Sequence, residues 1–195
     1  MARRTAEDAA RTREAILDAG LHVFAERGFA GAQLEDIARR AEVTRGAFYH
    51  HFTNKADLYL AILQERWDTV MAPLLQQLRG RRKPATRLHA FVVAFIEAVR
   101  SDPRMKSLME MSLSGDVKLP EFQSGMSDKS AALELWTDAV AHVLEEAGHA
   151  ADARDRATAL VMFLNGVAVS ASLYPGASAL EARRLAQLAL DGVLG

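Results

Sequence analysis

Residues 34–52 read Leu34-Glu-Asp-Ile-Ala-Arg-Arg-Ala-Glu-Val-Thr-Arg-Gly-Ala-Phe-Tyr-His-His-Phe52, and this pattern predicts two short helices joined by a tight turn. In the first helix, apolar residues recur at the spacing of one helix face. In the second, Thr44 is placed as an N-cap, and Ala47, Phe48 and Phe52 point inward. The outward side then carries hydrogen-bond donors and acceptors but no acid. A helix-turn-helix presents its second helix to the major groove of DNA in this way.

The outward side of the second helix is suited to reading DNA. Arg45 is the predicted base reader, because its guanidinium fork matches O6 and N7 of guanine, a contact worth about 1–3 kcal/mol of discrimination. Gly46 lacks a side chain, so the helix backbone can approach the groove closely; the alternative is a surface glycine without such a role. Tyr49 and His50 suit phosphate contacts, and so does His51 unless it seals the helix against its neighbours.

Charge is unevenly distributed along the 195 residues, although the net charge is only −1. Residues 1–83 hold 14 Lys and Arg against 11 Asp and Glu, a net charge of +3. Residues 84–195 hold 10 Lys and Arg against 14 Asp and Glu, a net charge of −4. A mildly basic N-terminal part beside an acidic remainder is typical of a chain that contacts nucleic acid through its first part only.

Several classes of function are disfavoured by what the sequence lacks. It contains no cysteine, and hence no disulfide, thiolate nucleophile or Cys-based metal site. His50 and His51 diverge by about 100° on a helix and have no Cys or carboxylate at ligand spacing, so we expect no metal. No phosphate loop, Rossmann fingerprint or hydrolase motif occurs, so we expect neither an enzyme nor a cofactor. Without an apolar leader or a bilayer-length apolar run, the expected location is the cytoplasm, with no membrane partner.

Helical periodicity extends along the whole chain and predicts an all-α fold. We expect an N-terminal three-helix helix-turn-helix domain over residues 1–53 and a larger helical domain over residues 54–195. Asn54 is placed to cap the fourth helix, and Pro73 inside that helix is expected to kink or split it. The expected helices, about nine in number, span residues 7–27, 33–40, 45–51, 55–78, 85–100, 103–113, 127–147, 153–174 and 178–194.

The helix expected over residues 153–174 is apolar around nearly its whole circumference, so it must be buried on all sides. The simplest arrangement is a two-fold homodimer in which this helix and the one over residues 178–194 form a four-helix bundle with their symmetry mates. The alternative is a helix buried centrally in a monomer. The predicted interface residues are Leu160, Phe163, Leu164, Val167, Ala171, Leu185, Leu188 and Ala189.

Four motif pieces occur in a recognisable order and spacing. They are Ile16-Leu-Asp-Ala-Gly-Leu-His-Val-Phe-Ala-Glu-Arg-Gly-Phe29, Glu35-Asp-Ile-Ala38, Ala41-Glu-Val-Thr-Arg-Gly-Ala-Phe-Tyr-His-His-Phe52 and Asn54-Lys-Ala-Asp-Leu58. Together they resemble the N-terminal domain of the TetR family of transcriptional regulators, and most of all its branch of multidrug-efflux repressors. The resemblance covers about residues 10–60. It implies a three-helix DNA-binding domain, a helical ligand-binding and dimerisation domain, and repression relieved by a small molecule.

The sequence departs from the family pattern at the start of the second helix and in the turn. The family usually has Thr or Ser at the positions of Ala32 and Gln33; Ala32 cannot cap, at a cost of about 1 kcal/mol, whereas Gln33 can still reach a phosphate. Glu42 occupies a turn position often held by glycine and is strained if left-handed. Lys55 adds a cation to a helix N-terminus disposed to bind phosphate. The predicted DNA-binding residues are Gln33, Thr44, Arg45, Gly46, Tyr49, His50, His51 and Lys55.

Large flexible and aromatic side chains are frequent between residues 60 and 170. Methionine clusters adapt to different ligands and suit a small-molecule pocket, although ordinary core packing is the alternative for each residue. Glu110, if it lies inside, would favour cationic lipophiles by its charge. The predicted ligand-binding residues are Trp67, Met71, Phe91, Phe95, Met109, Glu110, Trp136, Met162, Phe163 and Asn165.

These patterns predict a homodimeric transcriptional repressor whose operator binding is relieved by a small hydrophobic ligand. Each recognition helix would enter one half-site of a pseudopalindromic operator in double-stranded DNA, with half-sites about 34–36 Å apart or a small multiple. The ligand would shift the fourth helix and so change the spacing of the two recognition helices. The alternatives are a transcriptional activator, and a helical ligand-binding module whose vestigial helix-turn-helix binds a protein.

Overall fold

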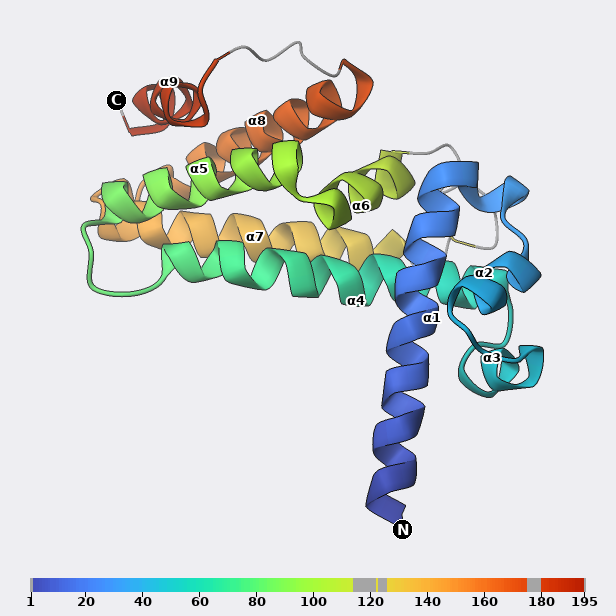
Figure 1. The fold of residues 1–195 in the computed structure, drawn as a ribbon. Helices are drawn as coiled ribbons and strands as arrows, with labels where there is room; N and C mark the ends of the chain where they lie inside the picture. The colour runs from blue at the N-terminus through green and yellow to red at the C-terminus, as the bar shows by residue number, and fades with distance from the viewer. Residues whose placement is uncertain (1, 114–121, 123–125, 175–179, 195) are drawn as a thin grey trace. The chain divides into compact units, whose positions relative to one another are not determined.

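The computed structural model describes residues 2–113, 122, 126–174 and 180–194, and helices make up most of these parts (Figure 1). No β-strand occurs among the described residues, which confirms the predicted all-α fold. The α-helices are α1 Ala2–Gly31, α2 Leu34–Arg40, α3 Arg45–His51, α4 Lys55–Leu75, α5 Pro84–Ser101, α6 Pro103–Leu113, α7 Met126–Glu146, α8 Ala153–Leu173 and α9 Ala182–Leu194. A single 3₁₀ turn, η1 Gln76–Leu78, follows α4.

Most helices begin and end within two residues of their predicted positions, and α3 and α6 have the predicted bounds. α1 is longer than predicted, because it begins at Ala2. The backbone of Gly28 breaks α1 near its end with φ of 67°, a conformation that glycine adopts without strain. α9 begins at Ala182, whereas the expected first residue, Ser178, lies outside the described residues.

α4 is not split at Pro73. The helix continues two residues beyond the proline to Leu75 and then passes into η1. Because proline lacks a backbone N–H, Pro73 removes one hydrogen bond from this last turn of the helix. Val70, Met71 and Leu74 are buried on the packed side of the same segment and hold it in place. The α-helix therefore does not split at the proline itself; it gives way to the 3₁₀ turn three residues later, before the expected helix end at residue 78.

The chain forms two compact units, and the boundary between them does not coincide with the predicted domain boundary at residue 53. The first comprises residues 1–67 and 110–126, and the second comprises residues 68–109 and 127–195. The first part of α4 thus packs with α1–α3, because Gly20 of α1 allows a close approach: a Cβ there would lie 2.7 Å from Cδ1 of Ile62. As functional domains, residues 1–53 and 54–195 remain a prediction.

An aromatic cluster fills the core of the first unit. The ring of Tyr59 lies 5.0 Å from that of Phe24 and 5.5 Å from that of Phe29, between centroids and in edge-to-face geometry. Phe122 packs edge-to-face on Phe29 at 4.7 Å. The Tyr59 hydroxyl donates to the carbonyl of Met111 at 2.8 Å. α1, α4 and residues from the 110–126 segment are therefore joined around one core.

In the second unit, α5 packs against both α8 and α9 (Figure 1). Arg87, near the start of α5, is buried; its guanidinium donates to the carbonyl of Leu78 at 3.0 Å and pairs with Glu146 of α7. The hydrogen bond from Arg87 holds the pKa of the Glu146 carboxyl below its usual range. This pair joins η1, α5 and α7.

Candidate nucleic-acid interface

The turn between α2 and α3 sets the direction in which α3 begins. Glu42 in this turn has φ of 55°, the left-handed conformation that strains a residue with a Cβ. The Thr44 hydroxyl accepts a hydrogen bond from the Ala47 backbone N–H at 3.1 Å, which confirms Thr44 as the N-cap of α3. Phe48 and Phe52 are buried, so one side of α3 is fastened to the unit.

The opposite side of α3 is exposed. It presents Thr44, Arg45, Gly46, Tyr49 and His50. Nη1 of Arg45 lies 3.3 Å from Oε1 of Glu35 on α2, and the guanidinium lies 5.6 Å from the centroid of the Tyr49 ring. A hydrogen bond with Tyr49, and to a smaller extent the Glu35 carboxylate, raises the pKa of Arg45 above its ordinary value. Both neighbours compete with a base for the guanidinium of the predicted base reader.

His51 differs from His50, because it is partly buried at the end of α3. Burial lowers the pKa of its imidazole below the usual 6.5, and the charges of His50 and Arg13 lower it further. This environment favours the neutral imidazole, which carries no positive charge toward a phosphate but keeps one N–H donor. Of the two interpretations of His51, the structural one fits this environment better.

α2 begins without a side-chain cap. Gln33 is the N-cap residue, with φ of −106° and ψ of 136°, and no side-chain cap bond closes the first turn. Ala32 before it is buried. The missing cap at this position is thus confirmed, while the exposed Gln33 amide remains on the same surface as the start of α2.

Lys55, predicted to contact a phosphate, makes contacts within the first unit that the sequence did not predict. Its ammonium donates to the carbonyl oxygens of Phe29 at 2.6 Å and Ala32 at 3.1 Å, and lies 4.5 Å from the centroid of the Phe29 ring. Two of its three donors are used in this way. Lys55 fastens the start of α4 to the chain between α1 and α2, a role that sequence reasoning misses because the acceptors are backbone carbonyls far along the chain.

Replacing Gly46 with alanine should show whether glycine is needed at this position for DNA binding or for the stability of the fold. A Cβ at Gly46 would meet only Oγ1 of Thr44, at 3.9 Å, so the chain itself does not need glycine here. Alanine should leave Tm unchanged or raise it, since it is up to about 1 kcal/mol better than glycine in a helix. If the α3 backbone lies close to the groove, the same change should weaken DNA binding about fivefold or more, equivalent to about 1 kcal/mol. Equal DNA binding in gel shifts, with Tm unchanged, would give Gly46 a plain surface role.

Four of the predicted ligand-binding residues meet in one small pocket of the second unit. Phe91 and Phe95 of α5, Trp136 of α7 and Asn165 of α8 line it. Val161 and Leu164 complete its wall, and the cavity they enclose measures only about 10 Å³, roughly the room that one water molecule needs. Its apolar and aromatic walls with one amide match the chemistry of a lipophilic ligand, but these side chains would have to move apart to admit one, since ligand pockets are usually about 300–1,000 Å³.

The other predicted ligand-binding residues lie elsewhere. Met71 and Met109 are buried in ordinary core positions, and Phe163 is half-buried on α8. Met162 is 68% exposed, so it faces away from the interior of its unit. Glu110 and Trp67 belong to the first unit, where the Trp67 indole N–H donates to Oγ of Ser112 at 3.2 Å. Met162 and Phe163 lie on other sides of α8, and the remaining four residues belong to α4 and α6, whose described residues do not line this pocket.

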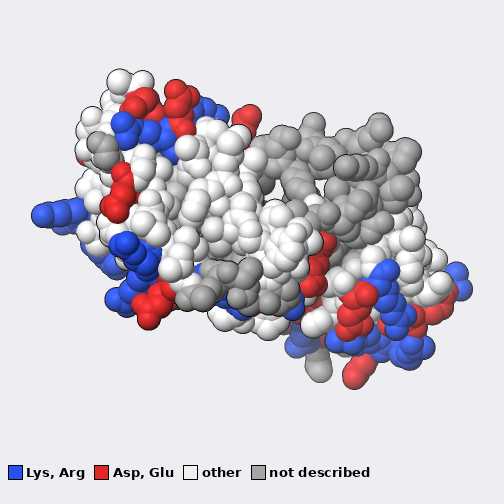
Figure 2. Space-filling view, turned by 90° about the horizontal axis from the view of Figure 1, so that it is seen from above, with Lys and Arg blue, Asp and Glu red and all other residues white. Residues whose placement is uncertain are grey.

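The predicted interface residues of α8 and α9 fall on different sides of these helices. Leu160 and Leu164 are 1% and 3% exposed, so their own chain covers them and the prediction of an interface role is wrong for both. The outward side instead carries Met162, Gly166 and Leu173, with Leu188 on α9. Phe163, Val167, Ala171, Leu185 and Ala189 are half-buried. Figure 2 looks onto the side of this unit where α8 and α9 lie and shows a broad area without charged side chains.

Glu35 and Arg13 contact the recognition region, although the sequence gives no local signal for either role. Glu35 faces Arg45 across the turn, and the Arg13 guanidinium lies 4.9 Å from the centroid of the Phe52 ring. Arg13 also pairs with Glu65, 52 residues away. The one available signal is the charge order Arg13-Glu14, which is complementary to Glu65-Arg66.

A short helix, capped by Thr44, fastened by Phe48 and Phe52 and exposing Arg45, defines a helix-turn-helix DNA-binding protein. The sequence model described as "Bacterial regulatory proteins, tetR family" matches residues 16–62. TtgW of Pseudomonas putida, an uncharacterized HTH-type transcriptional regulator, is 40% identical over 111 residues, which cover 57% of this chain and 79% of TtgW. The chain belongs to the TetR family of DNA-binding transcriptional regulators.

Two further comparisons extend this result. The regulator SrpR of Pseudomonas putida is 40% identical over 111 residues, and the match spans 57% of this chain but only 50% of the length of SrpR. A solved structure of SmeT, the repressor of the Stenotrophomonas maltophilia multidrug efflux pump SmeDEF, is 29% identical over 93% of this chain and 88% of SmeT, with a TM-score of 0.72. SmeT has also been solved as a complex with triclosan. Family membership confirms the prediction of a regulator and not an enzyme.

Proposed function

We propose that this chain is a cytoplasmic, homodimeric transcriptional repressor whose operator binding is relieved by a small hydrophobic ligand. The geometry of α3 carries the proposal, because a fastened inner side and an exposed Arg45 are what reading the major groove requires. The choice of repression over activation is supported by the similarity to SmeT, which is described as a repressor. The contacts to a pseudopalindromic operator would come from Gln33, Thr44, Arg45, Gly46, Tyr49 and His50.

The surface of α8 supports the homodimer. α8 is long and apolar enough to cross a membrane by length and composition, yet only 28% of its most apolar window is buried in the single chain. An apolar helix that its own chain leaves largely exposed needs another surface to cover it. In soluble proteins this covering surface is most often the same surface of a second, symmetry-related copy of the chain. A Cβ at Gly166 would meet nothing within 4 Å, so the open space above it suits the close approach of another helix.

The pocket between α5, α7 and α8 supports a hydrophobic effector. Its lining is aromatic and aliphatic with a single amide, Asn165, which would orient a ligand through one hydrogen bond. SmeT, a relative with the same fold, has been solved in complex with triclosan, a small hydrophobic molecule; a ligand of this size would enter here only if the lining side chains move apart. Such a ligand relieves repression only if it prefers the conformation with low DNA affinity.

A gel shift tests the proposal. The probe is the double-stranded DNA that flanks the chain's own gene, titrated at several salt concentrations, with triclosan added to the preformed complex. We expect a shift whose affinity falls steeply with salt, because phosphate contacts release counterions, and release of the DNA by triclosan. In transcription from the same fragment, the protein should lower the yield of transcript. Absence of a salt-dependent shift would favour the ligand-binding module, and a higher yield of transcript would favour the activator.

A further inference from the structure

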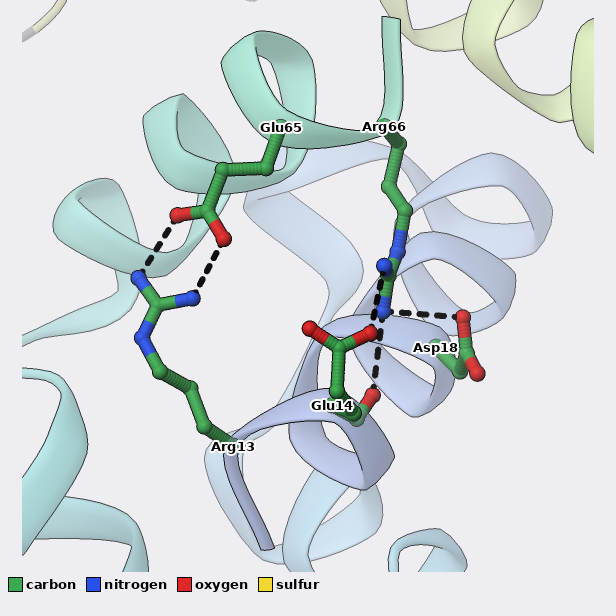
Figure 3. A network of polar contacts seen from close by, with 5 residues as sticks. All are labelled: Arg13, Glu14, Asp18, Glu65 and Arg66. Carbon is green, nitrogen blue, oxygen red and sulfur yellow. Dashed lines mark hydrogen bonds and ion pairs between the residues drawn. The ribbon is translucent and has the colours of Figure 1, made fainter. Parts of the chain in front are cut away.

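Two ion-pair groups flank the contact between α1 and α4 in the first unit (Figure 3). On one side, Arg13 of α1 meets Glu65 of α4. On the other side, Arg66 of α4 meets Glu14 and Asp18 of α1. Neighbouring residues on a helix point about 100° apart, so the adjacent pairs Arg13-Glu14 and Glu65-Arg66 reach around opposite sides of the same helix contact. Both groups join α1 to α4, but they differ in what else they contact.

The Arg66 group joins α1 to α4 only. Nη1 of Arg66 donates to Oε2 of Glu14 at 2.7 Å, and Nη2 donates to the Glu14 backbone carbonyl at 3.1 Å and lies 3.1 Å from Oδ1 of Asp18. The Arg66 side chain is only 9% exposed, whereas both acids are more than half exposed. Three acceptors on one turn of α1 therefore hold a single buried guanidinium, and loss of one acid leaves it with two.

The Arg13 group extends beyond these two helices. Its two terminal nitrogens donate to the two oxygens of Glu65 at 2.5 and 2.6 Å, a bidentate pair in which both side chains are partly buried. The hydrogen bond that Arg13 donates to the Glu65 carboxylate raises the pKa of Arg13 above its ordinary value. The same guanidinium lies over the ring of Phe52, with its carbon 4.9 Å from the centroid, as a cation–π contact. Phe52 is buried and is the C-cap residue of α3.

We infer that Arg13 is a positioning residue that ties the recognition helix α3 to α4. Glu65 on α4 fixes the guanidinium through a rigid fork, and the guanidinium fixes the last turn of α3 through Phe52. The residue needs no contact with DNA for this role. The inference rests on the proposed function, since it names how α4, the helix expected to move on ligand binding, would act on α3. Arg66 provides no such connection among the described residues, because the acceptors of its guanidinium, Glu14 and Asp18, lie on α1.

Two variants with the same charge change test this inference in the full-length chain. Glu65→Gln breaks the fork that holds Arg13, and Glu14→Gln removes one acceptor of Arg66; each removes one exposed or half-exposed negative charge. Charge alone predicts equal effects on DNA binding, and slightly tighter binding in both cases. Positioning predicts opposite effects, with weaker binding for Glu65→Gln only.

The first readout is hydrogen exchange of the α3 amides without DNA. We expect the exchange rate of the α3 amides to rise about fivefold in Glu65→Gln, because a well-formed, partly buried ion pair provides stabilisation of that size. In Glu14→Gln the rate should stay within about twofold of the wild-type rate. The second is the affinity for DNA flanking the gene, which should fall about fivefold in Glu65→Gln with the same slope against salt as the wild type, since no phosphate contact is lost.

Equal exchange rates at α3 in the two variants would overturn the inference, whatever the DNA binding. A reduced salt slope in Glu65→Gln would also overturn it, because that outcome would mean altered phosphate contacts. If the wild-type chain does not bind the fragment, the proposed function fails, and the exchange comparison still decides whether Arg13 positions α3.

Discussion

An Arg45→Ala variant should lose between about 5-fold and 150-fold in affinity for its operator, corresponding to the roughly 1–3 kcal/mol that a bidentate arginine–guanine contact supplies. Arg45 is exposed, and its partners in the DNA-free chain, Glu35 and Tyr49, are themselves exposed, so its removal should cost little stability. Operator affinity and affinity for random DNA, measured side by side, should converge in the variant. Dimerisation and ligand binding should be unchanged.

Arg40→Ala is the charge-matched control, because Arg40 is an exposed arginine at the end of α2 and not on α3. Loss of a general electrostatic contribution should weaken operator and random DNA alike. If both arginine variants weaken the two DNAs equally, Arg45 contacts phosphate and bases are read by another residue. Unchanged operator binding in Arg45→Ala would remove α3 from the interface altogether.

If the chain is the proposed homodimer, a Gly166→Lys variant should be a monomer and should lose operator binding at concentrations where the wild type is saturated. Gly166 lies on the outward side of α8 near Met162, and a Cβ there meets nothing in its own chain. Lysine should therefore be compatible with the monomer fold, and it gains about 1 kcal/mol of helix propensity over glycine. In a helix pair the same side chain would bury a charge against a close-packed neighbour, which costs several kcal/mol.

Sedimentation over a range of concentrations measures this effect, and circular dichroism shows whether the helices are intact. Ala85→Lys, on an exposed position of α5, is the control for adding a surface lysine. It should remain dimeric and bind DNA. A dimer that persists in Gly166→Lys with unchanged dissociation would place the interface on another surface and leave the apolar side of α8 unexplained.

Local signals predicted α3 almost completely. The cap at Thr44, the apolar spacing of Phe48 and Phe52 and the turn at Glu42 are decided by residues within a few positions of each other, and the structure contains them as expected. The role of Lys55 was not predictable in this way, because its acceptors are backbone carbonyls that tertiary folding brings near. Periodicity showed that α8 is apolar all round but not which side its own chain covers, so Leu160 and Leu164 were assigned to the wrong side.

The hydrogen bond from the Tyr59 hydroxyl to the Met111 carbonyl has a consequence for how this regulator can be cut and rejoined. The compact unit that contains α1–α3 is not one continuous segment of chain, because it comprises residues 1–67 and residues 110–126. If residues 1–67 alone were fused to another chain, the Tyr59 hydroxyl would lose its acceptor, which costs about 1–3 kcal/mol of stability for a buried donor. The rings of Phe29 and Tyr59, which pack against Phe122, would also become exposed. On the ribosome, the same core stays unfinished until that returning segment has emerged. Exchanging DNA specificity between regulators of this design therefore means moving two pieces of chain together.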